Sequence, residues 1–139
     1  MWRFILIPLF IVVAGCVQIP PSPQEIQAKK FESVPGKAVI YIVRAPMDSH
    51  EASGLLLDDT GPITTLAGTF YRWEVTPGVH RVAGYAGASE SVTLTAEAGK
   101  FYYLEHAVHG TPRSGPQFTF LRQIDERNGR ALVMRAQHL

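Results

Sequence analysis

The sequence predicts a mainly β protein, built as a single antiparallel β-sandwich of about seven strands. Short segments of β-branched and aromatic residues recur at roughly 8–12-residue intervals, a spacing typical of sandwiches and barrels. Turns that contain proline or glycine separate these segments, and no amphipathic segment of helical length interrupts them. The chain has one cysteine in 139 residues, which excludes an intrachain disulfide, so packing must stabilise the fold.

The expected strands follow one another through most of the chain. Residues 37–45 are almost wholly apolar, so we expect both faces of this first strand to be buried. Alternation in residues 69–75 places Trp73 on the side that faces the core. Pro77 and Gly78 have the order of a type II turn, which predicts that the next strand pairs with this one. The other expected strands are residues 54–58, 63–67, 80–86, 91–96, 100–108 and 117–124.

A short helix is expected before the first strand. Ser22, Pro23 and Glu25 have the order of a capping box, with proline at the first helical position. The helix would run from Pro23 to about Phe31. Because it carries few apolar residues, we expect it to depend on the rest of the domain for its stability.

The C-terminal segment, residues 125–139, admits two interpretations. Asn128 and Gly129 are a strong signal for a two-residue hairpin turn. Asp125 could instead cap a helix along the same segment, in which Gly129 would cost about 1 kcal/mol. The residue pattern by itself leaves both interpretations open.

The N-terminus has the organisation of a signal peptide. Arg3 precedes an apolar run, residues 5–13, that would span roughly 14 Å as a helix, about half the ~30 Å hydrocarbon core of a bilayer. A run of this length is typical of the apolar region of a signal peptide, and small residues follow it. The run ends in Val13, Ala14, Gly15 and Cys16, in one-letter code VAGC.

This tetrapeptide resembles the lipobox of bacterial lipoproteins, in which an aliphatic residue and two small residues precede a cysteine. The resemblance implies cleavage after Gly15 and transfer of a diacylglyceryl group to the thiol of Cys16. The chain would then consist of a signal peptide, a lipidated cysteine with a proline-rich tether and a short helix, and a β-sandwich domain. These regions are residues 1–15, 16–36 and 37–139.

A lipid on Cys16 would bind the protein to a membrane of the bacterial cell envelope. One acyl chain holds a protein only marginally, whereas two or three chains anchor it durably. Val17, and not aspartate, follows the cysteine. The lipobox resemblance implies the sorting rule of Gram-negative lipoproteins, in which a residue other than aspartate after the cysteine favours the outer membrane. The domain would then face the periplasm. No cofactor other than the covalent lipid is expected.

Three segments of the domain together resemble a bacterial family, domain of unknown function 2846. They are the first strand with Tyr41 and Arg44, the turn that ends in His80, and residues 99–104. The resemblance covers about residues 28–139. It implies a transthyretin-like or immunoglobulin-like sandwich in a small envelope lipoprotein, favours a helix at the C-terminus, and implies no known activity. The loop after the first strand lacks the short glycine turn usual in the family.

Residues that could carry chemistry do not form a catalytic pattern, so we expect no enzyme. No serine lies in a nucleophile elbow, and Asp58 and Asp59 fall in an expected turn, where aspartate is common for backbone reasons. His106 and His109 are three residues apart in a strand, which places them on opposite faces and argues against a metal site. These two histidines and Tyr102 are instead expected at the solvent-facing end of the strand, as a binding surface.

Arg44 lies in the most apolar strand, where an unpaired charge would not be tolerated. We therefore expect a structural ion pair between Arg44 and a carboxylate, with Glu74 and Glu105 as the candidates.

The charge balance of 13 basic and 12 acidic residues, without runs of one sign, argues against a nucleic-acid partner. The expected function is that of a non-enzymatic binding or assembly accessory module, with an envelope protein or a cell-wall polymer as its partner. A carbohydrate- or peptidoglycan-binding module is the first alternative, and outward aromatic side chains beside polar residues would favour it. A small metal-binding or hydrolytic protein is the second.

Overall fold

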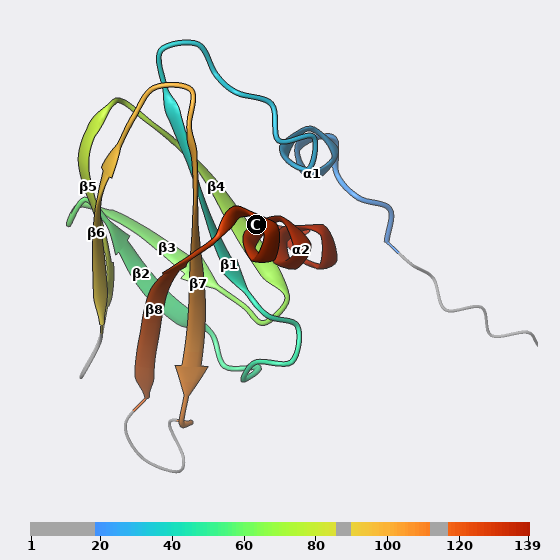
Figure 1. Cartoon of the computed structure of the whole chain (residues 1–139). Helices are drawn as coiled ribbons and strands as arrows, with labels where there is room; N and C mark the ends of the chain where they lie inside the picture. The colour runs from blue at the N-terminus through green and yellow to red at the C-terminus, as the bar shows by residue number, and fades with distance from the viewer. Residues whose placement is uncertain (1–18, 86–89, 112–116) are drawn as a thin grey trace, which may run out of the picture.

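Strand β1, Ala38–Arg44, lies at the centre of the fold, and all seven of its residues are buried, as its apolar sequence predicts. It pairs antiparallel with β4, Thr69–Val75, and parallel with β7, Phe101–His109. The structure, a computed structural model, describes residues 19–85, 90–111 and 117–139 (Figure 1). The predicted signal peptide and lipidation site, Gly15 and Cys16 included, lie outside these residues.

The described residues form a two-layered β-sandwich, which confirms the predicted fold class (Figure 1). One sheet has five strands in the order β8-β7-β1-β4-β9, and the other has four in the order β3-β2-β5-β6. The strands not yet given are β2 Ser53–Leu57, β3 Gly61–Thr65, β5 Gly78–Gly84, β6 Ser91–Ala96, β8 Phe118–Ile124 and β9 Gln137–His138.

Two details of the predicted sandwich are wrong. The described chain has nine strands and not about seven, because residues 37–124 hold eight strands and a two-residue strand, β9, is added at the C-terminus. The five-stranded sheet is also mixed, since β1 pairs parallel with β7 and β4 pairs parallel with β9. Parallel neighbours need a long connection, and here the whole four-stranded sheet lies between β1 and β7 along the chain.

The predicted hairpin across Pro77 and Gly78 is also wrong. Strand β4 pairs with β1 in the five-stranded sheet, whereas β5 pairs with β2 and β6 in the other sheet. Residues 76 and 77 therefore carry the chain from one layer to the other. Gly78 has φ of +141°, so the expected positive φ is present although the turn joins two sheets.

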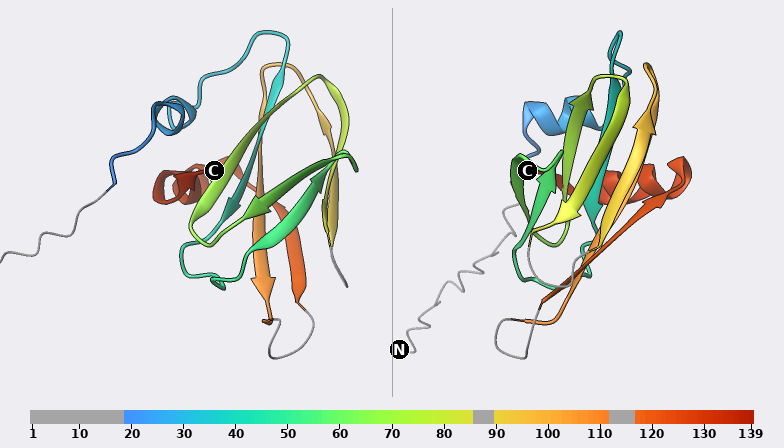
Figure 2. Two further views of the ribbon diagram at one scale, coloured as in Figure 1. Left: turned by 180° about the vertical axis from the view of Figure 1, so that it is seen from behind. Right: turned by 90° about the vertical axis from the view of Figure 1, so that its left-hand side faces the viewer.

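Two hydrophobic cores explain why β1 is apolar on both faces. Its residues Ile40 and Ile42 belong to the inner core, between the two sheets. Its residues Val39, Tyr41 and Val43 belong to the outer core, between the five-stranded sheet and the two helices. Both helices lie on the same side of the sandwich, against the five-stranded sheet (Figure 2).

Trp73 lies on the face of β4 that the alternation predicts. It packs against the inner core together with Tyr71, and Val75 of the same face is buried there. Trp73 and Tyr71 are half-buried, because they lie near the side of the sandwich where β3 and β4 leave a cavity between the sheets. The predicted strand phase is therefore confirmed, with a less complete burial of the indole than expected.

Helix α1, Pro23–Ala28, begins at Ser22 as predicted and ends before Phe31. The Ser22 hydroxyl accepts a hydrogen bond from the backbone N–H of Glu25 at 3.1 Å, which satisfies one donor of the first turn. The Glu25 side chain does not complete the capping box. It binds Lys29 at 2.6 Å and accepts from the backbone N–H of His138 at 3.4 Å, so it ties α1 to the C-terminal strand β9.

Helix α2, Glu126–Arg135, decides between the two interpretations of the C-terminus, and the hairpin is wrong. Asp125 is the N-cap, and its carboxylate accepts from the backbone N–H of Asn128 at 3.0 Å. Gly129 is buried against the ring of Tyr103, and a Cβ at this position would overlap that ring. The glycine therefore lets the helix approach the sheet closely and does not mark a turn. Neither described helix has the length and hydropathy that crossing a membrane requires.

We expect Gly129→Ala to destabilise the protein by about 1–3 kcal/mol, although alanine favours helix formation. The added methyl group would force Tyr103 and α2 apart. Urea unfolding measures the difference, and Arg127→Ala, a change at an exposed position of the same helix, should alter stability by no more than about 0.5 kcal/mol. A Gly129→Ala protein as stable as its parent would contradict the close packing of α2 on Tyr103.

Candidate functional site

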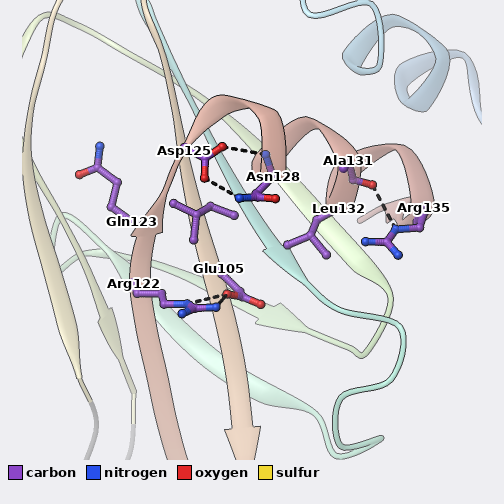
Figure 3. A pocket seen from close by; sticks show the side chains of 9 residues that line it. Glu105, Arg122, Gln123, Asp125, Asn128, Ala131, Leu132 and Arg135 are labelled. Atoms are coloured by element: carbon purple, nitrogen blue, oxygen red, sulfur yellow. Dashed lines mark hydrogen bonds and ion pairs between the residues drawn. The ribbon is translucent and has the colours of Figure 1, made fainter.

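A groove runs over the outer face of β7 and β8, beside helix α2, and we call it the β7–β8 groove. It consists of two adjoining cavities of about 530 and 450 Å³. Both cavities are lined by Glu105 of β7 and Arg122 of β8, which therefore lie at the middle of the groove. Figure 3 shows these two side chains among the residues that line the first cavity. The first cavity extends toward α2, and the second extends along the strands toward His109 and Phe120.

Glu105 and Arg122 are direct neighbours across the β7–β8 ladder, so the sheet itself holds them together. Arg122 donates from Nε to Oε2 of Glu105 at 2.6 Å, and its Nη2 lies 2.5 Å from the same oxygen (Figure 3). The Arg122 side chain is 74% exposed, whereas that of Glu105 is 21% exposed. The carboxylate thus lies deeper in the groove, and the guanidinium lies over it at the surface.

The side of the groove formed by α2 is polar. Asp125 accepts from both the backbone N–H and the side-chain amide of Asn128, and these bonds hold the pKa of its carboxyl below the usual range. Arg135 donates from Nε to the carbonyl oxygen of Ala131 at 3.2 Å, one turn earlier in the helix (Figure 3). The helix therefore presents a carboxylate, an amide and a guanidinium along the groove.

The other end of the groove is aromatic. Phe120 is 42% exposed, and the His109 ring packs against it in a T-shaped contact with 5.0 Å between ring centroids. The partner of Phe120 across the β7–β8 ladder is Ala107, whose small side chain leaves room beside the phenyl ring. Phe118 also points to the outer face and is 39% exposed. Outward aromatic side chains beside polar residues are therefore present here, on β8.

The structure brings only one of the three predicted surface residues of β7 into this groove. His109 is exposed and lines the second cavity. Tyr102 instead packs against the inner core, with its hydroxyl accepting from the backbone N–H of Glu97 at 3.0 Å. His106 is fully buried, so its predicted position at the surface is wrong, whereas Tyr102 is half-buried at the edge of the inner core. The physical reason is alternation, which places both on the inner face with the buried Leu104, opposite to His109.

His106 belongs to a buried polar cluster at the end of the inner core. Its Nδ1 lies 3.1 Å from the Thr65 hydroxyl, while its Nε2 has no partner among the described residues. Burial, together with the positive charge of Arg44, lowers the pKa of His106 to about 4, so the imidazole is neutral near pH 7. The cluster is closed to solvent, which suits a structural role.

Arg44 is buried and ion-paired, but its partner is Asp48 and not Glu74 or Glu105. Its Nε donates to Asp48 Oδ2 at 2.8 Å, in the loop that directly follows β1. Arg44 lies on the inner face of β1, whereas Glu74 and Glu105 lie on the outer face of their strands, where they pair with Arg72 and Arg122.

The guanidinium of Arg44 also holds the loop through backbone carbonyls. It donates to the carbonyl oxygens of Ser49 at 2.5 Å, Glu51 at 2.8 Å and Thr65 at 3.1 Å. Asp48 in turn accepts from the backbone N–H of Val108 at 3.1 Å. One buried ion pair therefore joins β1, its loop, β3 and β7.

Asp58 and Asp59 form a tight turn between β2 and β3, as expected, and both have positive φ, 49° and 60°. Asp58 accepts from His80 Nδ1 at 2.7 Å, and the other nitrogen of this ring, Nε2, lies 2.7 Å from the carbonyl oxygen of Thr76. Both partners can only accept, so His80 must carry a proton on each nitrogen to bind both. In the described part of the chain, no three His, Cys, Asp or Glu side chains gather as a metal site would need.

The geometry around His80 explains the direction of its pKa. Burial alone would lower the pKa of His80, but the hydrogen bonds to Asp58 and Thr76 and the charge of Asp58 together raise it above 6.5. The protonated ring links the β2–β3 turn to the segment that crosses between the sheets.

Comparison with known proteins finds neither a family model that matches the chain nor a curated protein similar to it. The fold and the β7–β8 groove are therefore described from the chain's own residues.

We expect Arg44→Met to destabilise the protein by about 3–5 kcal/mol, because Asp48 would be left buried without its counter-charge. Chemical denaturation measures the loss. Arg122→Met removes an arginine from an exposed ion pair and should cost no more than about 1 kcal/mol. Equal losses in the two variants would mean that the Arg44–Asp48 pair does not hold the loop.

His80 should stabilise the protein most at low pH. Its pKa is higher in the folded state than in the unfolded state, so its stabilisation is complete below about pH 6.5 and is lost as the pH rises through the folded pKa. The difference in unfolding free energy between the parent and His80→Gln, measured in urea at several pH values, should therefore shrink toward alkaline pH. The contribution of the buried His106 to stability changes with pH in the opposite direction, but it is the same in both proteins and cancels in the difference. A difference that stays constant or grows with pH would show that His80 is neutral in the fold.

Proposed function

We propose that the protein is a lipid-anchored protein of the bacterial cell envelope that acts, without catalysis, as a binding or assembly accessory module. The β7–β8 groove is the observation that carries this proposal: an open site of aromatic and polar side chains on a rigid sheet. An envelope protein or a cell-wall polymer is the partner that such a site would bind, and the membrane is reached through the lipid.

The arrangement of the N-terminal segment supports an anchor at Cys16. Residues 19–22 are exposed and have no regular secondary structure, and they include Pro20 and Pro21. They run beside the C-terminal strand, where a cavity is lined by these prolines and by Gln137 and His138. Seven residues, the number from Cys16 to Ser22, span at most roughly 25 Å however the chain is arranged. A lipid on Cys16 would thus keep the domain close to the bilayer surface.

The bonds of the groove's carboxylates support binding over catalysis. Glu105 is paired with Arg122, and Asp125 is engaged at the N-terminus of α2. Glu90, which lines the second cavity, accepts from the backbone N–H of Leu121 at 3.1 Å. Each carboxylate is thus held in place by a partner within the protein, as a preorganised binding surface requires.

Cys16→Ser should abolish acylation and leave the uncleaved precursor, because serine lacks the thiol that receives the lipid. A fatty-acid probe and the mobility of the protein in a gel measure both effects in the producing bacterium. Gln18→Ala, two residues away, should be processed and labelled like the parent. Normal cleavage after Gly15 and normal labelling of the Cys16→Ser protein would refute the lipoprotein proposal.

A further inference from the structure

We propose that the β7–β8 groove binds a neutral glycan chain, with one pyranose ring packed on Phe120 and polar groups of the chain bonded to Glu105 and Arg122. This inference rests on the proposed function and names the chemical class of its ligand. Three features of the groove carry it, namely an aromatic platform, a pair of planar polar groups, and a near balance of charge.

Phe120 provides the platform. Its ring is 42% exposed and is held in place by the ring of His109 and by the ladder partner Ala107. An apolar side chain of this size in open solvent, on the outer face of an edge strand, loses the benefit of burial unless a ligand covers it. One face of a pyranose ring carries mainly C–H groups, so the ring can cover the phenyl face while its hydroxyls point to the sides.

Glu105 and Arg122 provide the planar polar groups. Arg122 contacts Glu105 through Nε and Nη2, and both contacts end on Oε2 of Glu105, so neither of them uses Oε1 of Glu105 or Nη1 of Arg122. A carboxylate oxygen accepts and a guanidinium N–H donates, and neighbouring sugar hydroxyls can do both. Arg122 lies two residues along β8 from Phe120, about 7 Å away, and Glu105 is its neighbour on β7, so both groups can reach a ligand that covers the ring.

The charges of the groove favour a neutral ligand. The groove holds two guanidinium groups and three carboxylates, so its charges nearly cancel. Most of these groups already bind within the protein; they are Arg122, Arg135, Glu90, Glu105 and Asp125. A polyanion or a strongly basic peptide would gain little attraction from this arrangement. The two cavities adjoin and share Glu105 and Arg122, which fits an extended chain better than a single compact molecule.

The test uses the processed, acylated protein from the producing bacterium in detergent micelles and three probes: purified peptidoglycan sacculi, a linear tetramer of N-acetylglucosamine, and a linear tetramer of glucose. Phe120→Ala and Arg122→Ala should each weaken binding by about tenfold or more, which corresponds to the loss of one main contact of a binding site. Tyr85→Ala, which removes an aromatic ring that is 67% exposed beyond the end of the other sheet, should change binding by less than about twofold. Thermal melting shows whether each variant is folded, and the backbone signals of β7, β8 and α2 should shift when a tetramer is added.

Saturable binding of any probe that falls in both groove variants supports the proposal, and the probe that binds identifies the source. Preference for the N-acetylglucosamine tetramer or for sacculi indicates peptidoglycan, whereas preference for the glucose tetramer indicates another polysaccharide. No saturable binding of the three probes, or binding that folded Phe120→Ala and Arg122→Ala proteins retain, overturns the proposal. That failure leaves the lipid anchor untouched, because acylation of Cys16 is measured separately. Absence of acylation in the producing bacterium would in turn refute the anchor and leave the glycan proposal standing.

Discussion

Strand β1 is buried on both of its faces, and the other elements of the fold satisfy this constraint. Its inner face requires the four-stranded sheet, which covers Ile40 and Ile42. A sandwich of two sheets alone would leave Tyr41 and Val43 in solvent, so the helices must cover the outer face. The same constraint reaches the end of the strand, where the buried guanidinium of Arg44 finds its acceptors in the loop that follows.

Local signals predicted the elements, whereas their pairing depended on contacts between distant parts of the chain. The apolar run of β1 and the Ser22 cap act within a few residues, and these predictions are confirmed. The Asp125 cap is equally local, and the structure decides in its favour between two interpretations that the residues left open. The crossing from β4 to β5 and the parallel pair of β1 and β7 are set by how whole sheets pack, which no short window contains. The need for glycine at position 129 also could not be predicted from nearby residues, because it arises from the ring of Tyr103, which lies on β7.

The groove was predicted only in part, because the two faces of its strands are chemically alike. In β7 aromatic residues point to both sides, so the sequence did not show that Tyr102 faces inward and His109 outward. In β8 the usual rule fails at three positions, since Phe118 and Phe120 are partly exposed while Thr119 is buried. The alternation along β8 does predict that Phe118, Phe120 and Arg122 share one face. It does not predict that Glu105 and α2 lie beside them.

The proposed glycan site and the proposed lipid attachment lie at opposite edges of the five-stranded sheet. The groove belongs to β8 and β7, whereas α1 and the tether are fastened at β9, where Glu25 accepts from the backbone of His138. A pull between a wall-held glycan and a membrane-held lipid would therefore pass sideways through the ladders that join β7, β1 and β4. The hydrogen bonds of these ladders lie along that pull. Strand β1, clamped by packing from above and below, would then be the mechanical link between the wall and the membrane.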